Sequence, residues 1–378
     1  MNIHNTYFFK MYLFAQNYKK NTPKEWAEHV KFYIGGWFFA SIFFYIMRQV
    51  GVSGLGHLDF TVPKLIFFIP AFAVFSGTIF GSLQYFFEQY LFRKIPLWKL
   101  LVRLCIDQLL IISLLTVIYY FAITMMEMNT LSLSFWDFLR SPSAFIYYLY
   151  VFLVNSILSL LLEITRLLGR GNFFKLIAGK FYSPKEEFRI FMFVDLNSST
   201  TIAEKLGHLT YSNFIKDCFY DLAIVHNYDA QIYQYVGDEA VLTWERSKMK
   251  SIMECVDAFW AFSDELLKKS ETYKDKYGIV PEFKAGMSIG MVTVVEIGDF
   301  KKEIAYHGNT LNTAARIEAV CNIYGEKLLV SKKMYDELVK ENSTYTYTKV
   351  AETQLKGKQG ITEIYSINRT VSIPVEAV

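Results

Sequence analysis

The chain has 378 residues, enough for two domains, and its 39 Lys and Arg against 36 Asp and Glu leave a net charge of +3. So small a charge is no argument for binding to nucleic acid, and we expect none. The four cysteines are scattered and form no CxxC pair, which argues against a zinc site and a disulfide framework. Apolar residues concentrate in the first half of the chain and charged residues in the second, so we expect two domains of different kinds.

Four long apolar segments fill the first half, over residues 30–50, 65–87, 101–126 and 142–165. The stretches 65–87 and 141–162 contain no Asp, Glu, Lys or Arg. A helix needs about 20 mostly apolar residues to span a bilayer. The sequence therefore predicts an all-α transmembrane bundle of four helices over residues 30–168, embedded in a lipid bilayer. Arg103 and Asp107 in the third segment either lie at the membrane interface or mark a polar site inside the bundle.

The lysines and arginines between these segments predict the orientation in the membrane. They cluster in the N-terminal segment 1–29, in the loop between the second and third apolar segments, and after the fourth. The other two loops, 51–63 and 127–141, contain no Lys or Arg except Arg140. Because positive loops stay on the cytoplasmic side, we expect a multi-pass protein of the inner or plasma membrane. Both termini and the whole second half would then lie in the cytoplasm.

Residues 169–187 form a linker between the two halves. Gly169, Gly171 and Pro184 interrupt the helix that continues out of the fourth apolar segment. The linker is the covalent route by which the membrane domain could act on the second half. It is therefore either a signal relay or a passive tether.

The second half alternates strand and helix patterns. Residues 188–195 are an apolar run typical of a buried strand, and residues 199–226 carry apolar side chains at helical spacing. Beyond them we expect strands at 229–236 and 240–244, a helix at 248–277, two β-rich runs around Gly290 within 283–297, a helix at 309–324, a strand at 327–330, a helix at 331–341, and strands at 345–350 and 361–367. The order β-α-β-β-α-β predicts an α+β, ferredoxin-like domain over residues 188–369, followed by a tail over 370–378.

A single carboxylate, Asp195, ends the first of these strands. Small polar residues follow it before the helix begins: Asn197, Ser198, Ser199 and Thr200. A helix N-terminus exposes backbone N–H groups that suit a phosphate, and a carboxylate beside it suits Mg²⁺. The stretch alone fits a metal–nucleotide site and an ordinary helix cap equally well.

Three further residues strengthen the interpretation as a nucleotide site. Asp238 lies at the tip of a predicted hairpin, so it can lie beside Asp195 across the sheet, and two carboxylates there could hold two metal ions. Asn312 and Arg316 are four residues apart and share a helix face. Together they could stabilise a developing phosphate charge, although alone such a pair also fits a solvated helix face.

Three motifs, FMFVDLNSST, YQYVGDEAVL and HGNTLNTAARI, together resemble the catalytic domain of class III nucleotidyl cyclases, the adenylyl and guanylyl cyclases. The resemblance runs from about Phe188 to Ile367. It implies conversion of a nucleoside triphosphate to a 3′,5′-cyclic monophosphate and pyrophosphate, with two Mg²⁺ or Mn²⁺ ions in each site. By the same resemblance, metal binding falls on Asp195, the backbone carbonyl of Leu196 and Asp238, catalysis on Asn312 and Arg316, and phosphate binding on residues 197–200 and on Lys356 or Lys358.

The resemblance also implies an assembly. Members of that family work as head-to-tail dimers, in which one subunit supplies the aspartates of a site and the other supplies the Asn/Arg pair. This chain carries both sets, so we expect a homodimer with two equivalent sites. A single subunit would then be inactive.

The chain departs from the family pattern at three positions. Ser198 stands where the family usually has glycine, which leaves the phosphate loop less conformational freedom. Gln234 and Ala305 stand at the base-selecting positions, where adenylyl cyclases have Lys and Asp and guanylyl cyclases have Glu and Cys. Neither pattern is present. We expect ATP as the substrate, with GTP or a pyrimidine triphosphate as alternatives.

Three other functions stay open. An inactive, cyclase-like membrane receptor fits the altered Gln234 and Ala305 pair, although the metal and Asn/Arg positions are intact. A diguanylate cyclase would need a GGDEF-type hairpin, of which only Gly237-Asp238-Glu239 is present. A transporter is disfavoured because the four predicted spans hold few charges. The sequence favours a membrane-anchored adenylate cyclase that its membrane domain controls or merely tethers.

Overall fold

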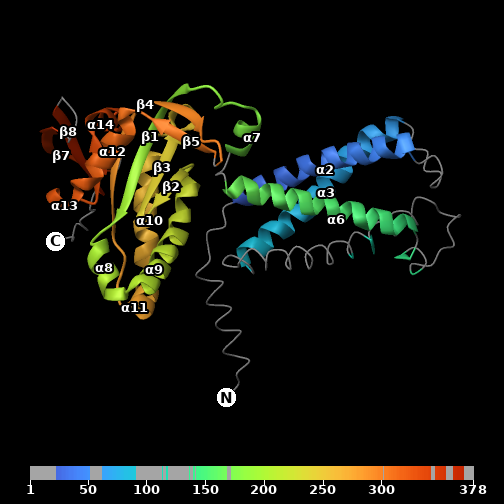
Figure 1. Cartoon of the computed structure of the whole chain (residues 1–378), viewed down its shortest axis with the longest axis horizontal. Helices are drawn as coiled ribbons and strands as arrows, with labels where there is room; N and C mark the ends of the chain where they lie inside the picture. The colour runs from blue at the N-terminus through green and yellow to red at the C-terminus, as the bar shows by residue number, and fades with distance from the viewer. Residues whose placement is uncertain are drawn as a thin grey trace, which may run out of the picture. The chain divides into compact units, whose positions relative to one another are not determined.

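The computed structural model describes residues 23–51, 62–90, 142–167, 172–300, 302–341, 345–354 and 361–369, together with positions 113, 116, 117, 136, 139 and 140. The chain divides into two compact units, Met1–Ile164 and Thr165–Val378. The described part of the first unit is helical, and the second unit is built on a sheet (Figure 1).

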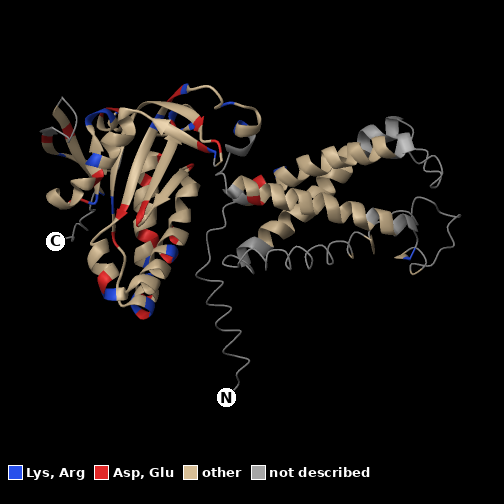
Figure 2. Cartoon of the chain, viewed as in Figure 1, with Lys and Arg blue, Asp and Glu red and all other residues tan. Residues whose placement is uncertain are grey.

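Three long helices make up most of the described part of the first unit: α2 (Pro23–Gly51), α3 (Val62–Tyr90) and α6 (Pro142–Leu167). Each contains a stretch that is long and apolar enough to cross a membrane, namely Trp26–Met47, Ile69–Phe86 and Tyr148–Thr165. Figure 2 shows that charged residues are sparse along these helices and numerous in the second unit. The first, second and fourth predicted spans are thus found as helices. Most of the third, 101–126, lies outside the described residues, so the four-helix bundle stays a prediction.

Small residues let α2 pack closely against both neighbouring helices. A Cβ atom on Gly77 of α3 would lie 2.5 Å from backbone atoms of Ile34, and one on Gly36 of α2 would lie 2.3 Å from the side chain of Leu158. Glycine at such crossings is typical of helices that associate in a bilayer. Large apolar side chains on the outer surface, such as Phe39 at 73% exposure, have the composition expected of a surface that faces lipid.

An eight-stranded sheet forms the second unit, in the order β2-β3-β1-β4-β6-β8-β7 with β5 paired to β4. The strands are β1 (Lys185–Leu196), β2 (Gln231–Val236), β3 (Glu239–Glu245), β4 (Phe283–Ile297), β5 (Glu303–His307), β6 (Leu328–Ser331), β7 (Tyr345–Gln354) and β8 (Ile361–Arg369). Central β1 pairs antiparallel with β3 and β4, and β2 pairs antiparallel with β3. The run β2-β3-β1-β4, with helices after β1 and β3, is the predicted ferredoxin-like arrangement, and the α+β fold class is confirmed.

Helical segments precede the first strand and connect the others. They are α7 (Asn172–Ile177), α8 (Ser199–Leu206), α9 (His208–Asp221), η1 (Leu222–Tyr228), η2 (Arg246–Lys248), α10 (Met253–Lys268), α11 (Ser270–Tyr277), α12 (Asn309–Ala319), α13 (Cys321–Tyr324) and α14 (Lys332–Leu338). Most expected elements are present with shifted ends, as is usual for boundaries predicted from patterns.

Five expectations were wrong in detail, one of them the helix expected at 309–324, which is divided at Val320 into α12 and α13. The helix expected at 199–226 is divided at Gly207, whose φ of 72° ends α8, and the one expected at 248–277 is divided at Lys269. Residues 283–297 form one continuous strand rather than two runs. Gly290 does not end that strand, because its missing side chain makes room for Thr310, which a Cβ atom would meet at 2.5 Å. The pattern also missed β5, a strand of five residues.

The apolar residues of β1 alternate between two cores. Those at even positions from 190 to 196 join a large core that includes α9 and α10, whereas Phe191 and Phe193 join a smaller core that includes residues of α12. We call the two sides of the sheet the α9–α10 face and the α12 face. Because side chains alternate along a strand, Arg189 and Asp195 lie on the α12 face, at opposite ends of the Phe191–Phe193 pair.

Candidate active site

Asp195 and Asp238 meet at one end of the sheet. Asp195 is the penultimate residue of β1 and lies in register with Glu239 of β3 on one side and Lys284 of β4 on the other. Asp238 occupies the turn directly before Glu239. Burial raises the pKa of Glu239 and of Tyr211, and the charges of both aspartates raise it further. The structure therefore brings the two aspartates into one electrostatic environment, with Glu239 rather than Asp238 directly opposite Asp195.

Lys284 balances the negative charge at this end of the sheet. Its Nζ lies 3.1 Å from Oδ2 of Asp195 and 2.6 Å from Oε1 of Glu318 in α12. Burial of Lys284 opposes its charge, but the hydrogen bonds with Glu318 and Asp195 raise its pKa, so it stays protonated at neutral pH. The sequence analysis missed Lys284 and Glu318. The signal for Lys284 is a lone cation in the otherwise uncharged run 283–292, since a buried charge needs a partner.

Glu239 titrates close to neutral pH in the folded protein. Burial, followed by the charges of Glu318, Asp195 and Asp238, raises the pKa of Glu239 from 4.5 to about 7. The folded state therefore favours the protonated carboxyl. This contribution to stability is fully present below the unfolded pKa and is lost as the pH rises through about 7.

Replacing Glu239 by glutamine is expected to remove part of the loss of stability that occurs between about pH 5 and pH 8. The full shift corresponds to about 3 kcal/mol, and solvent screening at a partly exposed group reduces this to about 1 kcal/mol. Urea unfolding at both pH values, without divalent ions, measures it. Glu271→Gln, at a carboxylate with 79% side-chain exposure, is the control and should follow the wild type. Equal pH profiles for wild type and Glu239→Gln would contradict the prediction.

The loop after β1 presents the N-terminus of a helix. α8 begins at Ser199, and the side chain of Ser198 makes no capping hydrogen bond to it. The N–H of Asn197 donates to the carbonyl of Glu282 at 2.8 Å, while the buried Oδ1 of Asn197 has no hydrogen-bond partner. Thr200 is exposed. The first N–H groups of α8 lack a partner within the helix, so the loop offers donors and one acceptor to a polar ligand beside the aspartates.

Ser198→Gly is expected to stabilise the protein. Ser198 has φ 56° and ψ 33°, a left-handed conformation that costs a residue with a Cβ atom about 1 kcal/mol. Glycine should therefore raise the free energy of unfolding by up to about 1 kcal/mol, measured by urea denaturation. Ser198→Ala keeps the Cβ atom and is the matched control, from which no gain is expected. An equal gain from alanine would show that the backbone conformation is not the cause.

α12 carries Asn312 and Arg316 on the side that is turned away from the sheet. The residues of α12 buried beneath it are Thr310, Thr313, Ala314, Ile317 and Glu318. At 3.6 residues per turn, Asn312 and Arg316 fall on the opposite side of the helix, and Asn312 is exposed. Among the described residues, no hydrogen bond or ion pair joins either side chain to Asp195 or Asp238. Asn312 and Arg316 are therefore not bonded to the aspartates of their own chain.

A bulge in β2 turns Gln234 toward the α12 face. Ile232 lies opposite Leu242 and Gln234 opposite Val241, so Tyr233 is an extra residue in the strand. Val241 belongs to the core on the α12 face. Without the extra residue, strict alternation would put Gln234 on the α9–α10 face, since a slip of one residue reverses every side chain.

The strands that carry the two base-selecting positions touch each other. Ala305 in β5 is buried and pairs with Val295 of β4. The next residue, Tyr306, lies with its ring centroid 4.9 Å from that of Tyr233, which precedes Gln234. Gln234 and Ala305 supply one amide and no charge between them. The structure thus brings the two strands together without restoring either familiar base-selecting pattern.

The carboxylates fit a metal ion that is shared with a substrate. Within the described parts of the chain, no three His, Cys, Asp or Glu side chains are arranged to enclose a metal ion. Mg²⁺ is commonly held by one or two carboxylates together with waters and substrate phosphates, and Asp195 and Asp238 supply two. Leu196, whose carbonyl was assigned to metal binding, ends β1 opposite Phe283. Lys356 and Lys358, the predicted phosphate-binding lysines, lie outside the described residues.

Most of the second unit is similar to known proteins. Residues 182–369 match the family "Adenylate and Guanylate cyclase catalytic domain". A curated relative, Adenylate cyclase 2 of Rhizobium meliloti (strain 1021), is 33% identical over 178 residues, which are 47% of this chain and 49% of that relative. The chain thus spans about half the length of the curated relative that it matches.

Solved structures of cyclases are similar to this chain. A bacterial light-regulated adenylyl cyclase superposes with a TM-score of 0.51 and 16% identity, over 61% of this chain and 67% of that chain. The adenylyl cyclase CyaB from P. aeruginosa gives a TM-score of 0.44 and 17% identity, over 50% of this chain and 97% of that chain. The first of these likenesses shows a shared fold.

Proposed function

We propose that the chain converts ATP to 3′,5′-cyclic AMP and pyrophosphate, on the premise that residues 182–369, which match the adenylate and guanylate cyclase catalytic domain family, act as such a domain. The 3′-oxygen of ATP forms a bond to the α-phosphorus while the bond from that phosphorus to the bridging oxygen breaks. Pyrophosphate leaves, and the 3′-hydroxyl proton passes to water. The observation that supports the proposal is that Asp195 pairs with Glu239, the residue after Asp238, beside the N-terminus of α8 and within the residues that match this family.

Each site residue has a role that its chemistry supports. Asp195, the carbonyl of Leu196 and Asp238 would hold two Mg²⁺ or Mn²⁺ ions, which neutralise phosphate charge and make the 3′-hydroxyl more acidic. The N–H groups of residues 197–200 would bind phosphate oxygens. Lys284 keeps Asp195 charge-balanced. Asn312 and Arg316 would orient the sugar and stabilise the charge that develops on the α-phosphate, and Lys356 or Lys358 would add a phosphate contact.

A homodimer would complete the site. Asn312 and Arg316 lie on the side of α12 opposite the residues that it buries against the sheet, so a second copy of the chain is the simplest source of an Asn/Arg pair for the aspartates. Two chains related by a two-fold axis would form two equivalent sites. The outward direction of the Asn/Arg pair supports this arrangement.

The three apolar helices support anchoring in a lipid bilayer. We propose four spans in residues 30–168, with the segment 1–29, the linker 169–187 and the catalytic domain 188–369 in the cytoplasm and a short tail after residue 369. The excess of Lys and Arg in alternate loops supports this orientation. Protease added to inverted membrane vesicles should remove the catalytic domain, whereas protection of the domain would reverse the orientation.

Product identification tests the activity and the base together. The full chain, in membranes or detergent, is incubated separately with ATP, GTP, CTP and UTP in the presence of Mg²⁺ or Mn²⁺. We expect cyclic AMP and pyrophosphate from ATP. Turnover of GTP or of a pyrimidine triphosphate instead would assign another base, which the uncharged Gln234 and Ala305 pair also accommodates. If a dimeric preparation leaves all four untouched, the enzymatic proposal fails and an inactive cyclase-like receptor is favoured.

A further inference from the structure

Arg189 is a buried cation that the proposed reaction does not use. It lies on the α12 face of β1, six residues before Asp195, and is 0% exposed. Its Nε donates to Oε2 of Glu187 at 2.8 Å, and its Nη1 donates to Oγ1 of Thr243 at 3.1 Å and to Oε1 of Gln231 at 3.4 Å. A buried guanidinium is tolerated only when its donors are satisfied. Arg189 therefore fixes the relative positions of β1, β2 and β3.

The guanidinium also contacts the strands that carry the base-selecting positions. Its central carbon lies 4.8 Å from the centroid of the Tyr306 ring, a distance that suits a cation–π interaction. Tyr306 in turn contacts Tyr233. Since Tyr306 follows Ala305 and Tyr233 precedes Gln234, the packing around Arg189 sets how β2 and β5 lie relative to each other.

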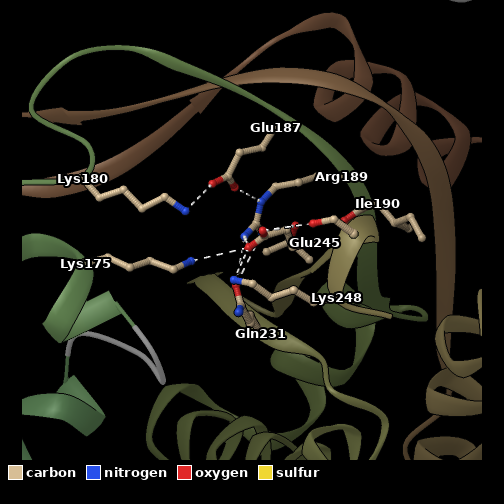
Figure 3. Close-up of polar contacts among 10 residues, drawn as sticks. Lys175, Lys180, Glu187, Arg189, Ile190, Gln231, Glu245 and Lys248 are labelled. Atoms are coloured by element: carbon tan, nitrogen blue, oxygen red, sulfur yellow. Dashed lines mark hydrogen bonds and ion pairs between the residues drawn. The ribbon is translucent and has the colours of Figure 1, made fainter. Parts of the chain in front are cut away.

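The carboxylates that bind Arg189 also bind the linker. Lys175 of α7 places its Nζ 3.6 Å from Oε2 of Glu245, and Lys180 places its Nζ 3.5 Å from Oε1 of Glu187. Glu245 also lies 3.8 Å from Nη2 of Arg189. Figure 3 shows the two lysines reaching from the linker side toward the carboxylates that Arg189 contacts. Linker and sheet thus share two acidic groups.

An apolar anchor sets the same segment against the sheet. Phe181 is fully buried in the core on the α12 face, and Nζ of Lys175 and of Lys180 lie 5.4 Å and 5.6 Å from its ring centroid. The carbonyl of Phe181 accepts a hydrogen bond from the N–H of Glu296 in β4 at 2.9 Å. A displacement of α7 therefore changes the contacts of Glu187 and Glu245, the two carboxylates that Arg189 contacts.

Of the cations around Glu245, the linker lysine is held weakly. Oε2 of Glu245 lies 2.5 Å from Nζ of Lys248 but 3.6 Å from Nζ of Lys175. The buried Nζ of Lys175 makes no hydrogen bond. Burial, followed by the charge of Lys248, lowers the pKa of Lys175. Lys175 therefore competes with Lys248 for one carboxylate, and a small movement of α7 suffices to release it.

We propose that Arg189 is a positioning residue that transmits the position of the linker helix α7 to strands β2 and β5, so that release of Lys175 from Glu245 weakens nucleotide binding. The proposal rests on the proposed function of the site. The contact chain runs from Lys175 through Glu245 and Arg189 to Tyr306 and Tyr233. Displacing its first member leaves Glu245 paired with Lys248 and Arg189 alone, which redistributes the bonds of Arg189 and loosens the tyrosine contact between the two strands.

The experiment compares two lysines on one carboxylate in the full chain. Lys175→Met removes the linker contact, and Lys248→Met removes the contact made from η2 within the catalytic domain. Amide hydrogen exchange in residues 231–236 and 303–307 is measured by mass spectrometry, together with KM and kcat for ATP. Lys175→Met is expected to speed exchange in both strands and to raise KM by about three- to tenfold, with kcat changed by less than about twofold. Lys248→Met should leave exchange and KM at wild-type values.

A third variant tests Arg189 itself. Arg189→Lys keeps the positive charge but loses the planar guanidinium that contacts Tyr306, so we expect the same loosening of both strands. In the Arg189→Lys background, Lys175→Met should then add little, because the chain of contacts is already broken. Thermal unfolding confirms that each variant is folded.

Two results separate this proposal from the proposed function. If Lys175→Met and Lys248→Met both leave exchange in the two strands unchanged, the positioning role is wrong even when the protein makes cyclic AMP. If the wild type makes no cyclic nucleotide, the proposed function fails, but exchange still decides whether the linker positions β2 and β5.

Discussion

Asp238→Ala is expected to reduce cyclic AMP formation by about 100- to 1,000-fold, the size of effect seen when a preorganised electrostatic group of an active site is lost. Asp238 lies in the turn beside the cross-strand partner of Asp195, so its removal leaves one carboxylate where two would hold the metal ions. The loss should appear in kcat at saturating Mg²⁺, because added metal does not replace a missing ligand. Asn312→Ala should cause a comparable loss by removing a group from the other side of the site.

Mixing the two variants gives a sharper result. Each homodimer lacks either the aspartate or the asparagine in both of its sites. A dimer of one Asp238→Ala chain and one Asn312→Ala chain has one intact site, because the intact Asp238 and the intact Asn312 come from different chains. With random pairing, half of the dimers are mixed, so activity should return to about a quarter of the wild-type value.

The control for the mixing experiment is a chain that carries both substitutions, co-expressed with each single variant. It should restore no activity with either partner, because no site then has both groups. Recovery by the two single variants is expected only if residues of two chains build one site. If the mixture stays inactive while dimers form, Asn312 and Asp238 act within one chain, and the outward direction of Asn312 in α12 has another reason.

Gly286→Ala is the second change for which we expect a large effect. A Cβ atom on Gly286 would lie 2.1 Å from the backbone nitrogen of Glu318 and 2.5 Å from the backbone oxygen of Ala314. These are main-chain atoms of α12 and cannot move aside alone, so the helix must shift as a unit. We expect the free energy of unfolding to fall by about 1–3 kcal/mol, and kcat to fall by about tenfold or more because α12 carries Asn312 and Arg316.

Gly290→Ala is the matched comparison on the same strand. The atom nearest to its new Cβ would be the hydroxyl oxygen of Thr310, at 2.5 Å, and the other close atoms also belong to that side chain. A side chain can rotate, so the loss of stability should be clearly smaller than for Gly286→Ala. Urea unfolding and initial rates of cyclic AMP formation measure both variants. Equal losses would mean that the approach of the α12 backbone to Gly286 is not the controlling contact.

Local patterns were sufficient for the elements that carry the candidate site. Apolar runs of about 20 residues predicted the spans, because span length depends only on the thickness of the bilayer. Three of these predicted spans are helices in the structure. Alternation and helical spacing placed Asp195 at the end of a strand and Asn312 with Arg316 on one helix face, because both periods are properties of the backbone. The β-α-β-β-α-β order then predicted that the first strand and the hairpin that carries Asp238 are neighbours, as the sheet order shows.

Other features depend on contacts between segments far apart in the sequence. The ion pairs of Lys284 with Asp195 and Glu318 arise from the register of β1 with β4 and from the packing of α12 on β4, and no local pattern contains either. Gln234 faces the α12 side only because Tyr233 bulges out of β2, which is a property of the pairing with β3. Arg189 is likewise buried only because side chains from β1, β2 and β3 bind it and the ring of Tyr306 in β5 packs against it.

The sequence by itself determined the kinds of domain, the order of the strands and helices, and which polar residues stand at their ends, since each of these follows from local periodicity and composition. Only the tertiary structure decided which charges neutralise one another around Asp195, which face Gln234 occupies, and that the Asn/Arg pair lies on the side of α12 turned away from the sheet. Register, bulges and helix packing are settled by long-range burial and pairing. The direction of α12 therefore supplies a reason for a second chain that the helix pattern alone does not contain.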